Sequence, residues 1–457
     1  MTETKRAALD PRTRLATALR GLAWFAFSAL VVLSPLRARI DLIARPTVPV
    51  YGDFTDILLF WTDIAVVLTL GLWLASLVAR PRSLTVGPRF LAWPIAGLIV
   101  VAWLSVPFAV DVPLAAYNAL RLLMLAVLGL YAVNEIGQIR RLWVPIAVMV
   151  AGQAIVGIAQ VLGQHSLGLA GLGEWRLAPS LGVSVVTTID GTRVLRAFGL
   201  ADHPNILGGL LAVGLVLIAA RNPWQARRGR AIRLAVIAVG AIALLLTFSR
   251  GAWLALIVGL AVVVTMLGLN RAHAARRSVL IAGLVGAVAV APFALAFLPA
   301  LAARTDATGP ISTEVRSINE RVATAELTAQ LFAQHPITGV GLGGLPLAQH
   351  ALVPAFGYDY QPASLVVLDA AAETGIAGAL FYVLILTAPW LALWRARQRW
   401  TPDLGAASGA LAAVTVVGFV DYYTWAYPAG RIWFWLVLGL WVAAYRSAMA
   451  GQVDAPG

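Results

Sequence analysis

The stretch that decides the fold is LAVIAVGAIALLLTFSRGAWLALIVGLAVVVTMLGL, residues 234–269, in which Arg250 is the one charge. As a single helix its 36 residues would extend about 54 Å, far more than a hydrocarbon core about 30 Å thick. The stretch therefore predicts two membrane-spanning helices in a tight hairpin. The turn, Ser249 to Gly251, holds Arg250 half buried at the outer boundary of the membrane.

The composition of the whole chain agrees with a membrane protein. Of the 457 residues, 60% are hydrophobic and 12% are charged, and the mean hydropathy is +0.84. Such values exclude an ordinary soluble domain. The absence of cysteine excludes disulfides and Cys-based metal sites. The net charge of +13 reflects basic residues in short loops, which favours membrane orientation over nucleic-acid binding.

Apolar runs of similar length recur along the chain and predict an all-α, polytopic membrane helical bundle of about 12 transmembrane helices. We interpret residues 1–457 as a single transmembrane domain whose basic start precedes an uncleaved first span. The predicted spans are 17–35, 57–79, 90–106, 113–133, 142–162, 204–220, 234–249, 251–269, 279–298, 364–390, 404–422 and 431–445.

The distribution of charge predicts the orientation of these spans. With both termini in the cytoplasm, the cytoplasmic segments hold 22 of the 34 basic residues but only 5 of the 21 acidic ones. This bias is the positive-inside pattern. If residues 234–269 formed one span, the loop with Arg271, Arg276 and Arg277 would lie outside, against that pattern. The charge distribution thus also favours two spans.

Two long connections are predicted on the outer side, the first extracytoplasmic loop at 163–203 and a large one at 299–363. Both lie on the face of Arg250, so we expect function there. The large loop contains an amphipathic helix that begins with a capping box of Ser317 and Glu320 and carries Arg321 near its start. The glycine-rich GVGLGG that follows predicts close backbone packing or a turn, since no strand precedes it.

Arg250 has two interpretations. Arginine at membrane depth costs roughly 2.5–3.5 kcal/mol and usually faces a polar cavity, although it can also extend to the lipid headgroups. Arg196 precedes a helix start in which Asp202 or His203 can cap and Pro204 takes the first position. Helix N-termini with nearby arginines suit an anion, best a phosphate.

Asp369 and Glu373 lie four residues apart, on one face near the start of a span. They are either polar contacts between helices or groups that bind or deprotonate an acceptor hydroxyl. The residues alone leave both interpretations open.

Four fragments together resemble the O-antigen ligase and polymerase family of membrane glycosyltransferases, which have a C-type fold. They are RAFGLADHPN (196–205), TFSRGAWLAL (247–256), HPITGVGLGGLP (335–346) and ETGIAG (373–378). The resemblance covers roughly residues 196–381. It implies transfer of a glycan from a polyprenyl (undecaprenyl) diphosphate carrier to a hydroxyl acceptor on the outer face of the cytoplasmic, or inner, membrane.

The resemblance also implies roles for particular residues. Arg196 and Arg250 match the arginines that hold the diphosphate, and Arg321 matches a basic position ahead of the glycine turn. No metal and no cofactor is expected, because guanidinium groups neutralise the charge. The implied partners are a polyprenyl diphosphate-linked glycan donor, a glycan or lipid-linked acceptor and the lipid bilayer, with no nucleic acid.

One departure from the family pattern concerns the residue expected to act as the catalytic base. Counting back from Gly375 places Ser364 and Leu365 where the ligases have His-Asn. Either a nearby group such as His350 substitutes, or the chemistry differs from that of a ligase. We predict a catalytic role for His350, Glu373 or Asp369. The further candidates are Asp202, His203, Asn205, Glu320 and Ser364.

Two other functions fit the same sequence. Twelve spans and an arginine-lined cavity also suit a transporter or flippase of lipid-linked oligosaccharide, although no paired halves with broken helices are seen. A non-catalytic membrane scaffold would explain the missing histidine.

Overall fold

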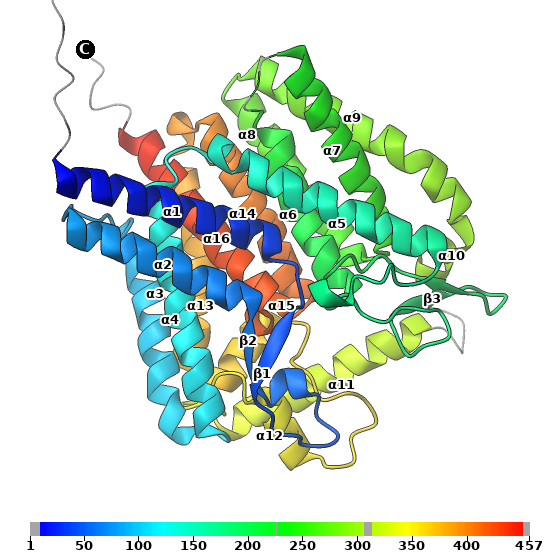
Figure 1. Ribbon diagram of the computed structural model, residues 1–457. Coiled ribbons are helices and arrows are strands. Elements are labelled where there is room, and N and C mark those ends of the chain that lie inside the picture. Colours follow the sequence, from blue (N-terminus) through cyan, green and yellow to red (C-terminus); the bar gives the residue numbers. More distant parts are fainter. Residues whose placement is uncertain (1–9, 223, 225, 306–312, 451–457) are drawn as a thin grey trace, which may run out of the picture.

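The computed structural model describes residues 10–222, 224, 226–305 and 313–450 (Figure 1). Over these residues the chain is an all-α bundle with two small two-stranded antiparallel sheets, β1–β2 and β3–β4. The predicted fold class is thereby confirmed. The helices are α1 (Pro11–Leu33), α2 (Trp61–Ala79), α3 (Arg89–Ser105), α4 (Val112–Glu135), α5 (Trp143–Gly163), α6 (Pro204–Ala220), α7 (Arg227–Leu246), α8 (Arg250–Leu269), α9 (His273–Ala296), α10 (Leu298–Thr305), α11 (Thr313–Gln334), α12 (Leu345–Leu352), α13 (Val366–Arg395), α14 (Pro402–Val420), α15 (Tyr423–Ala426) and α16 (Pro428–Ala450). The strands are β1 (Arg39–Ile43), β2 (Ile57–Phe60), β3 (Val185–Thr187) and β4 (Arg193–Leu195).

Each predicted span corresponds to a helix. In the described part of the chain, 11 helices are long and apolar enough to cross a membrane. The twelfth predicted span is α6, a shorter apolar helix of 17 residues. Its residues from Ile206 to Ala220 are all buried, because α5, α7, α8 and α14 surround it. A helix that is apolar on every side belongs at the centre of a bundle.

Residues 234–269 form parts of two helices, as their length requires. Helix α7 ends at Leu246 and α8 begins at Arg250, so the connection is residues 247–249. The predicted tight turn is therefore present, but the two helices do not pack along each other, because α7 packs mainly on α9 and α5 while α8 packs on α14 and α6. Gly259 of α8 and Gly409 of α14 explain this choice. A Cβ on either glycine would lie within 3.0 Å of the other's carbonyl oxygen, so the two helices approach as only small residues allow.

The first turn of α1 and the last turn of α16 lie at one end of the bundle, away from the sheets and the helices of the long connections. In Figure 1 the start of α1 and the end of α16 are both at the upper left. The β1–β2 sheet and the helices α11 and α12 lie in the lower half of the picture, and β3 and α10 lie at its right.

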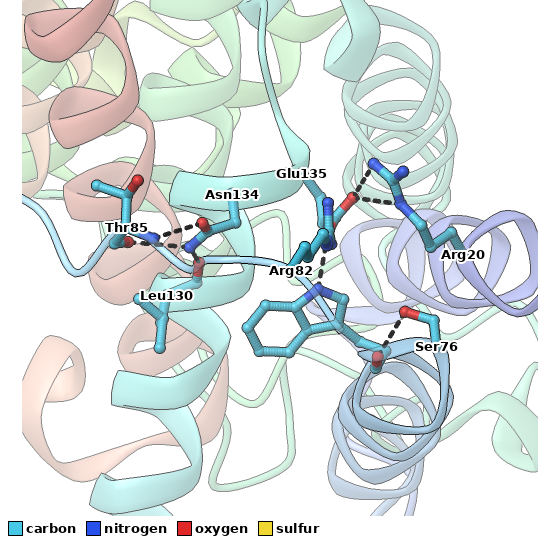
Figure 2. A network of polar contacts seen from close by, with 8 residues as sticks. Arg20, Ser76, Arg82, Thr85, Leu130, Asn134 and Glu135 are labelled. Carbon is cyan, nitrogen blue, oxygen red and sulfur yellow. Dashed lines mark hydrogen bonds and ion pairs between the residues drawn. The ribbon is translucent and has the colours of Figure 1, made fainter. Parts of the chain in front are cut away.

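A polar network joins α1, α2 and α4 near the chain ends (Figure 2). The Glu135 carboxylate accepts hydrogen bonds from Arg20 Nη2 at 2.8 Å and from Trp73 Nε1 at 2.7 Å, and it also accepts from Arg82. Next to it, the Asn134 side chain pairs with the backbone of Thr85 at 2.9 and 3.0 Å. The linker between α2 and α3 is thus held against α4.

Two local predictions differ from the structure. Residues 57–60 of the predicted span 57–79 are strand β2, and α2 begins at Trp61, where Asp63 Oδ2 accepts from Phe60 N at 3.0 Å. The predicted capping box of the amphipathic helix is also wrong, because α11 is helical from Thr313 and Ser317 lies inside it. A short apolar run can be a strand or the start of a helix, and a short amphipathic pattern does not fix the residue at which a helix begins.

The glycine-rich segment packs into a break in α13. Gly375 has φ 72° and ψ −177°, and a Cβ on it would lie 2.0 Å from Ile337 O. Ile376 N donates to Pro336 O at 2.8 Å, and Val340 N donates to Ala372 O at 2.9 Å. The close backbone packing expected for GVGLGG is therefore present, and a side chain at residue 375 would prevent it.

Candidate functional site

A cavity of about 210 Å³ is lined by the start of α8, the end of α14 and residues of α10 and α11. Three arginines line it, Arg250 from the first turn of α8, Arg304 from α10 and Arg321 from α11. Asn205 and Asp421 also line it. Asp421 is the one carboxylate among the described residues of the lining, so cationic groups predominate there.

Backbone carbonyl groups orient these arginines. Arg250 Nη1 donates to Arg304 O at 3.1 Å, and Arg304 Nε donates to Phe248 O at 3.2 Å. Arg321 Nη1 donates to Val420 O at 3.2 Å. The α8 N-terminus adds backbone N–H groups and the positive end of a helix dipole. Arg250 is exposed, where the sequence led us to expect a half-buried side chain. Guanidinium groups beside a helix N-terminus suit a phosphate.

Arg196 does not line this cavity but contacts Asn205, which does. It is buried, and its guanidinium donates to Thr247 O at 2.7 Å, Ser184 Oγ at 2.8 Å and Asn205 Oδ1 at 2.6 Å. Asn205 Nδ2 in turn donates to Asp421 Oδ2 at 2.9 Å. Asn205 therefore links Arg196 to the carboxylate in the cavity wall.

His203 is the N-cap of α6, as one of the two sequence alternatives predicted. Its Nδ1 accepts from Asn205 N at 3.1 Å. Burial lowers the pKa of His203 well below its usual value, and the nearby positive charges of Arg196, Arg321 and Arg304 lower it further. The lowered pKa favours the neutral form of the imidazole beside the arginine cluster.

Asp202, the other capping candidate, belongs to a separate ion pair. Its Oδ1 lies 2.7 Å from Arg37 Nε, and the Arg37 guanidinium covers the Trp175 ring, with its Cζ 3.6 Å from the ring centroid. Burial raises the pKa of Asp202 to about 6, and the neighbouring Asp53 adds to the shift while Arg37 opposes it. These contacts join the segment between α1 and β1 to the 164–203 connection.

The predicted catalytic residues do not line the arginine cavity. The His350 ring packs edge-on against Tyr360, with the centroids 5.1 Å apart. Asp369 is fully buried and accepts from Ala363 N at 2.8 Å. Glu373 accepts from Trp425 Nε1 at 2.7 Å. These contacts are those of side chains that hold helices and loops together.

Two other candidates also lie outside the described lining of the cavity. Ser364 lies two residues before the start of α13, whose N-cap is Leu365. Glu320 Oε1 accepts from Gln361 Nε2 at 3.0 Å, and burial together with the nearby charge of Asp359 raises the pKa of Glu320.

Sequence reasoning missed Arg304 and Asp421. Both follow predicted spans at the outer boundary, Arg304 after 279–298 and Asp421 at the end of 404–422. A search of each outer connection for a charged residue close to the predicted membrane boundary would have found both.

The fold and the cavity define a class, a polytopic helical membrane protein with an arginine-lined cavity at one end of the bundle. The sequence model of the O-Antigen ligase family matches residues 234–383. This match confirms the predicted resemblance to O-antigen ligases and polymerases over that part of the chain, and it supports a membrane glycosyltransferase of this general type. Arg250, Arg304 and Arg321 lie inside the matched segment, whereas Arg196 and Asp421 lie outside it. No curated protein matches the chain.

Proposed function

We propose that this protein transfers a glycan from a polyprenyl diphosphate carrier to a hydroxyl acceptor, at the extracytoplasmic face of the cytoplasmic membrane. The observation that carries the proposal is the convergence of Arg250, Arg304 and Arg321 on one cavity within the family-matched segment. The start of α1 and the end of α16 lie at the other end of the bundle, and the excess of basic residues in the connections predicted for that side supports a cytoplasmic location for it.

In the proposed reaction the acceptor hydroxyl oxygen attacks the anomeric carbon of the donor. The bond between that carbon and the phosphate oxygen breaks, and the diphosphate leaves with the electron pair. The three guanidinium groups stabilise the negative charge on the leaving oxygen, where a preorganised donor is worth about 10²–10³ in rate. The protein therefore acts mainly by holding the diphosphate and positioning the hydroxyl.

We propose Asp421 as the group that accepts the hydroxyl proton. It is the carboxylate that lines the same cavity, and Asn205 Nδ2 at 2.9 Å and Tyr422 N at 2.9 Å orient its two oxygens. A base must lie within reach of the proton that it removes, and this criterion favours Asp421 over His350 and Glu373. Arg196 acts through Asn205 as a positioning residue.

The test is glycan transfer by the full chain reconstituted with an undecaprenyl diphosphate-linked glycan and candidate acceptors, scored by product mass. Arg321→Ala should lower the rate by about 10²–10³. The matched control is Arg316→Ala, since Arg316 lies on the same helix, is exposed and is absent from the lining of the cavity. Asp421→Asn should lower the rate by about 10²–10⁴.

Two results would contradict the proposal. Equal rates for the two arginine variants would show that the cavity does not hold the diphosphate. Movement of the intact donor across the membrane without any transferred glycan would favour a flippase instead.

A further inference from the structure

The divergence of α7 and α8 leaves an apolar cavity of about 340 Å³ among α6, α7, α8 and α9. Its lining carries no charged residue among the described residues, and the helices around it are membrane spans or, for α6, an apolar helix. Small side chains open the space, namely Ala219, Ala241, Ala282, Gly283, Gly286 and Ala287. An apolar space of this size excludes water and can accept hydrocarbon.

This apolar cavity adjoins the arginine cavity across α8. Leu254 lines the arginine cavity, and the preceding residue, Trp253, lines the apolar one. The Trp253 indole also donates to Leu244 O at 3.0 Å, in the last turn of α7. A molecule whose anionic head occupies the arginine cavity therefore has hydrocarbon space within a turn of α8.

We infer that the apolar cavity holds the isoprene units nearest the diphosphate of the lipid donor. The inference rests on the proposed function, because the diphosphate is the group that places the chain beside α8. The three arginines of the adjacent cavity favour a diphosphate lipid over a membrane phospholipid, because a diphosphate carries more negative charge than a single phosphodiester. The volume accommodates a few isoprene units, and the remainder of the chain extends into the bilayer.

The experiment fills the cavity without disturbing the arginines. A Cβ at Gly283 meets no heavy atom within 4 Å, so Gly283→Leu adds a side chain to open space. Gly152→Leu is the matched control, since Gly152 is an exposed glycine of α5 with equally open surroundings. Binding to the full chain in phosphatidylcholine nanodiscs is measured with two probes, undecaprenyl diphosphate and inorganic pyrophosphate.

The expected result separates the two probes. Gly283→Leu should weaken undecaprenyl diphosphate binding by about tenfold, which corresponds to about 1.4 kcal/mol, and leave pyrophosphate binding within about twofold. Gly152→Leu should change neither. Arg250→Ala should weaken both, which tests the diphosphate site independently of the apolar cavity.

Three results would overturn the inference, and they differ from one another. If Gly283→Leu bound both probes with wild-type affinity while Arg250→Ala bound neither, the apolar cavity would not hold the lipid chain. The proposed function would then stand. Failure of the wild-type chain to bind either probe would remove both proposals. Equal displacement of undecaprenyl diphosphate by phosphatidylglycerol would show a general lipid site.

A second measurement needs no variant. An undecaprenyl diphosphate that carries a diazirine in the isoprene unit next to the diphosphate should label peptides of α8 and α9 in the wild-type chain. Labelling confined to α1–α4 would also overturn the inference.

Discussion

Replacement of Gly375 by alanine tests how the glycine-rich segment and α13 fit together. The residue has φ 72° and ψ −177°, a region that only glycine occupies without strain. A side chain forced there costs about 1–3 kcal/mol. The added Cβ would also lie 2.0 Å from Ile337 O, so the backbone on one side must move.

The movement breaks hydrogen bonds between the two segments. The bonds at risk join Ile376 N to Pro336 O, Val340 N to Ala372 O and Gly341 N to Glu373 O, at 2.8, 2.9 and 3.0 Å. Each contributes about 0.5–1.5 kcal/mol. With the strain, the expected loss of local stability is about 3–7 kcal/mol.

Hydrogen exchange at these amides is the assay. A loss of about 3 kcal/mol corresponds to exchange about 100-fold faster, so residues 340, 341 and 376 should lose at least this much protection in Gly375→Ala. The control is Gly286→Ala in α9, where the nearest contact of the new Cβ, Ala241 Cβ at 3.5 Å, is ordinary. There we expect no loss and up to about 1 kcal/mol of gain. Unchanged protection in Gly375→Ala would refute the reasoning.

Two further predictions concern other parts of the chain. Glu135→Gln should destabilise the protein by about 1–2 kcal/mol, measured by thermal unfolding. The reason is that the partly exposed Arg20 and Arg82 lose the carboxylate that they share, and the Glu135 side chain is only 8% exposed. An unchanged midpoint would show that the network does not contribute to stability. The pKa of His203 is lower in the folded than in the unfolded chain, so wild-type stability should fall as the pH drops below 6.5, the ordinary value. His203→Asn keeps a capping side chain and should lose that pH dependence, and a variant that retains it would place the titration elsewhere.

The positions of the spans could be predicted from the sequence because each depends on local quantities. A run of apolar residues either is or is not long enough to cross the hydrocarbon core, and the 36 residues from 234 to 269 are too long for one helix. The N-cap at His203 was similarly accessible, because a capping side chain acts on backbone groups two or three residues away.

The composition of the site was decided by tertiary packing. Arg304 and Asp421 join Arg250 and Arg321 because α8 packs on α14 through Gly259 and Gly409 and because α10 and α11 lie across the end of the bundle. The same packing separates α8 from α7 and opens the apolar cavity. Hydropathy records how each residue partitions between water and membrane, but it does not specify which helix faces meet. Small residues fixed that choice through contacts between segments far apart in the chain.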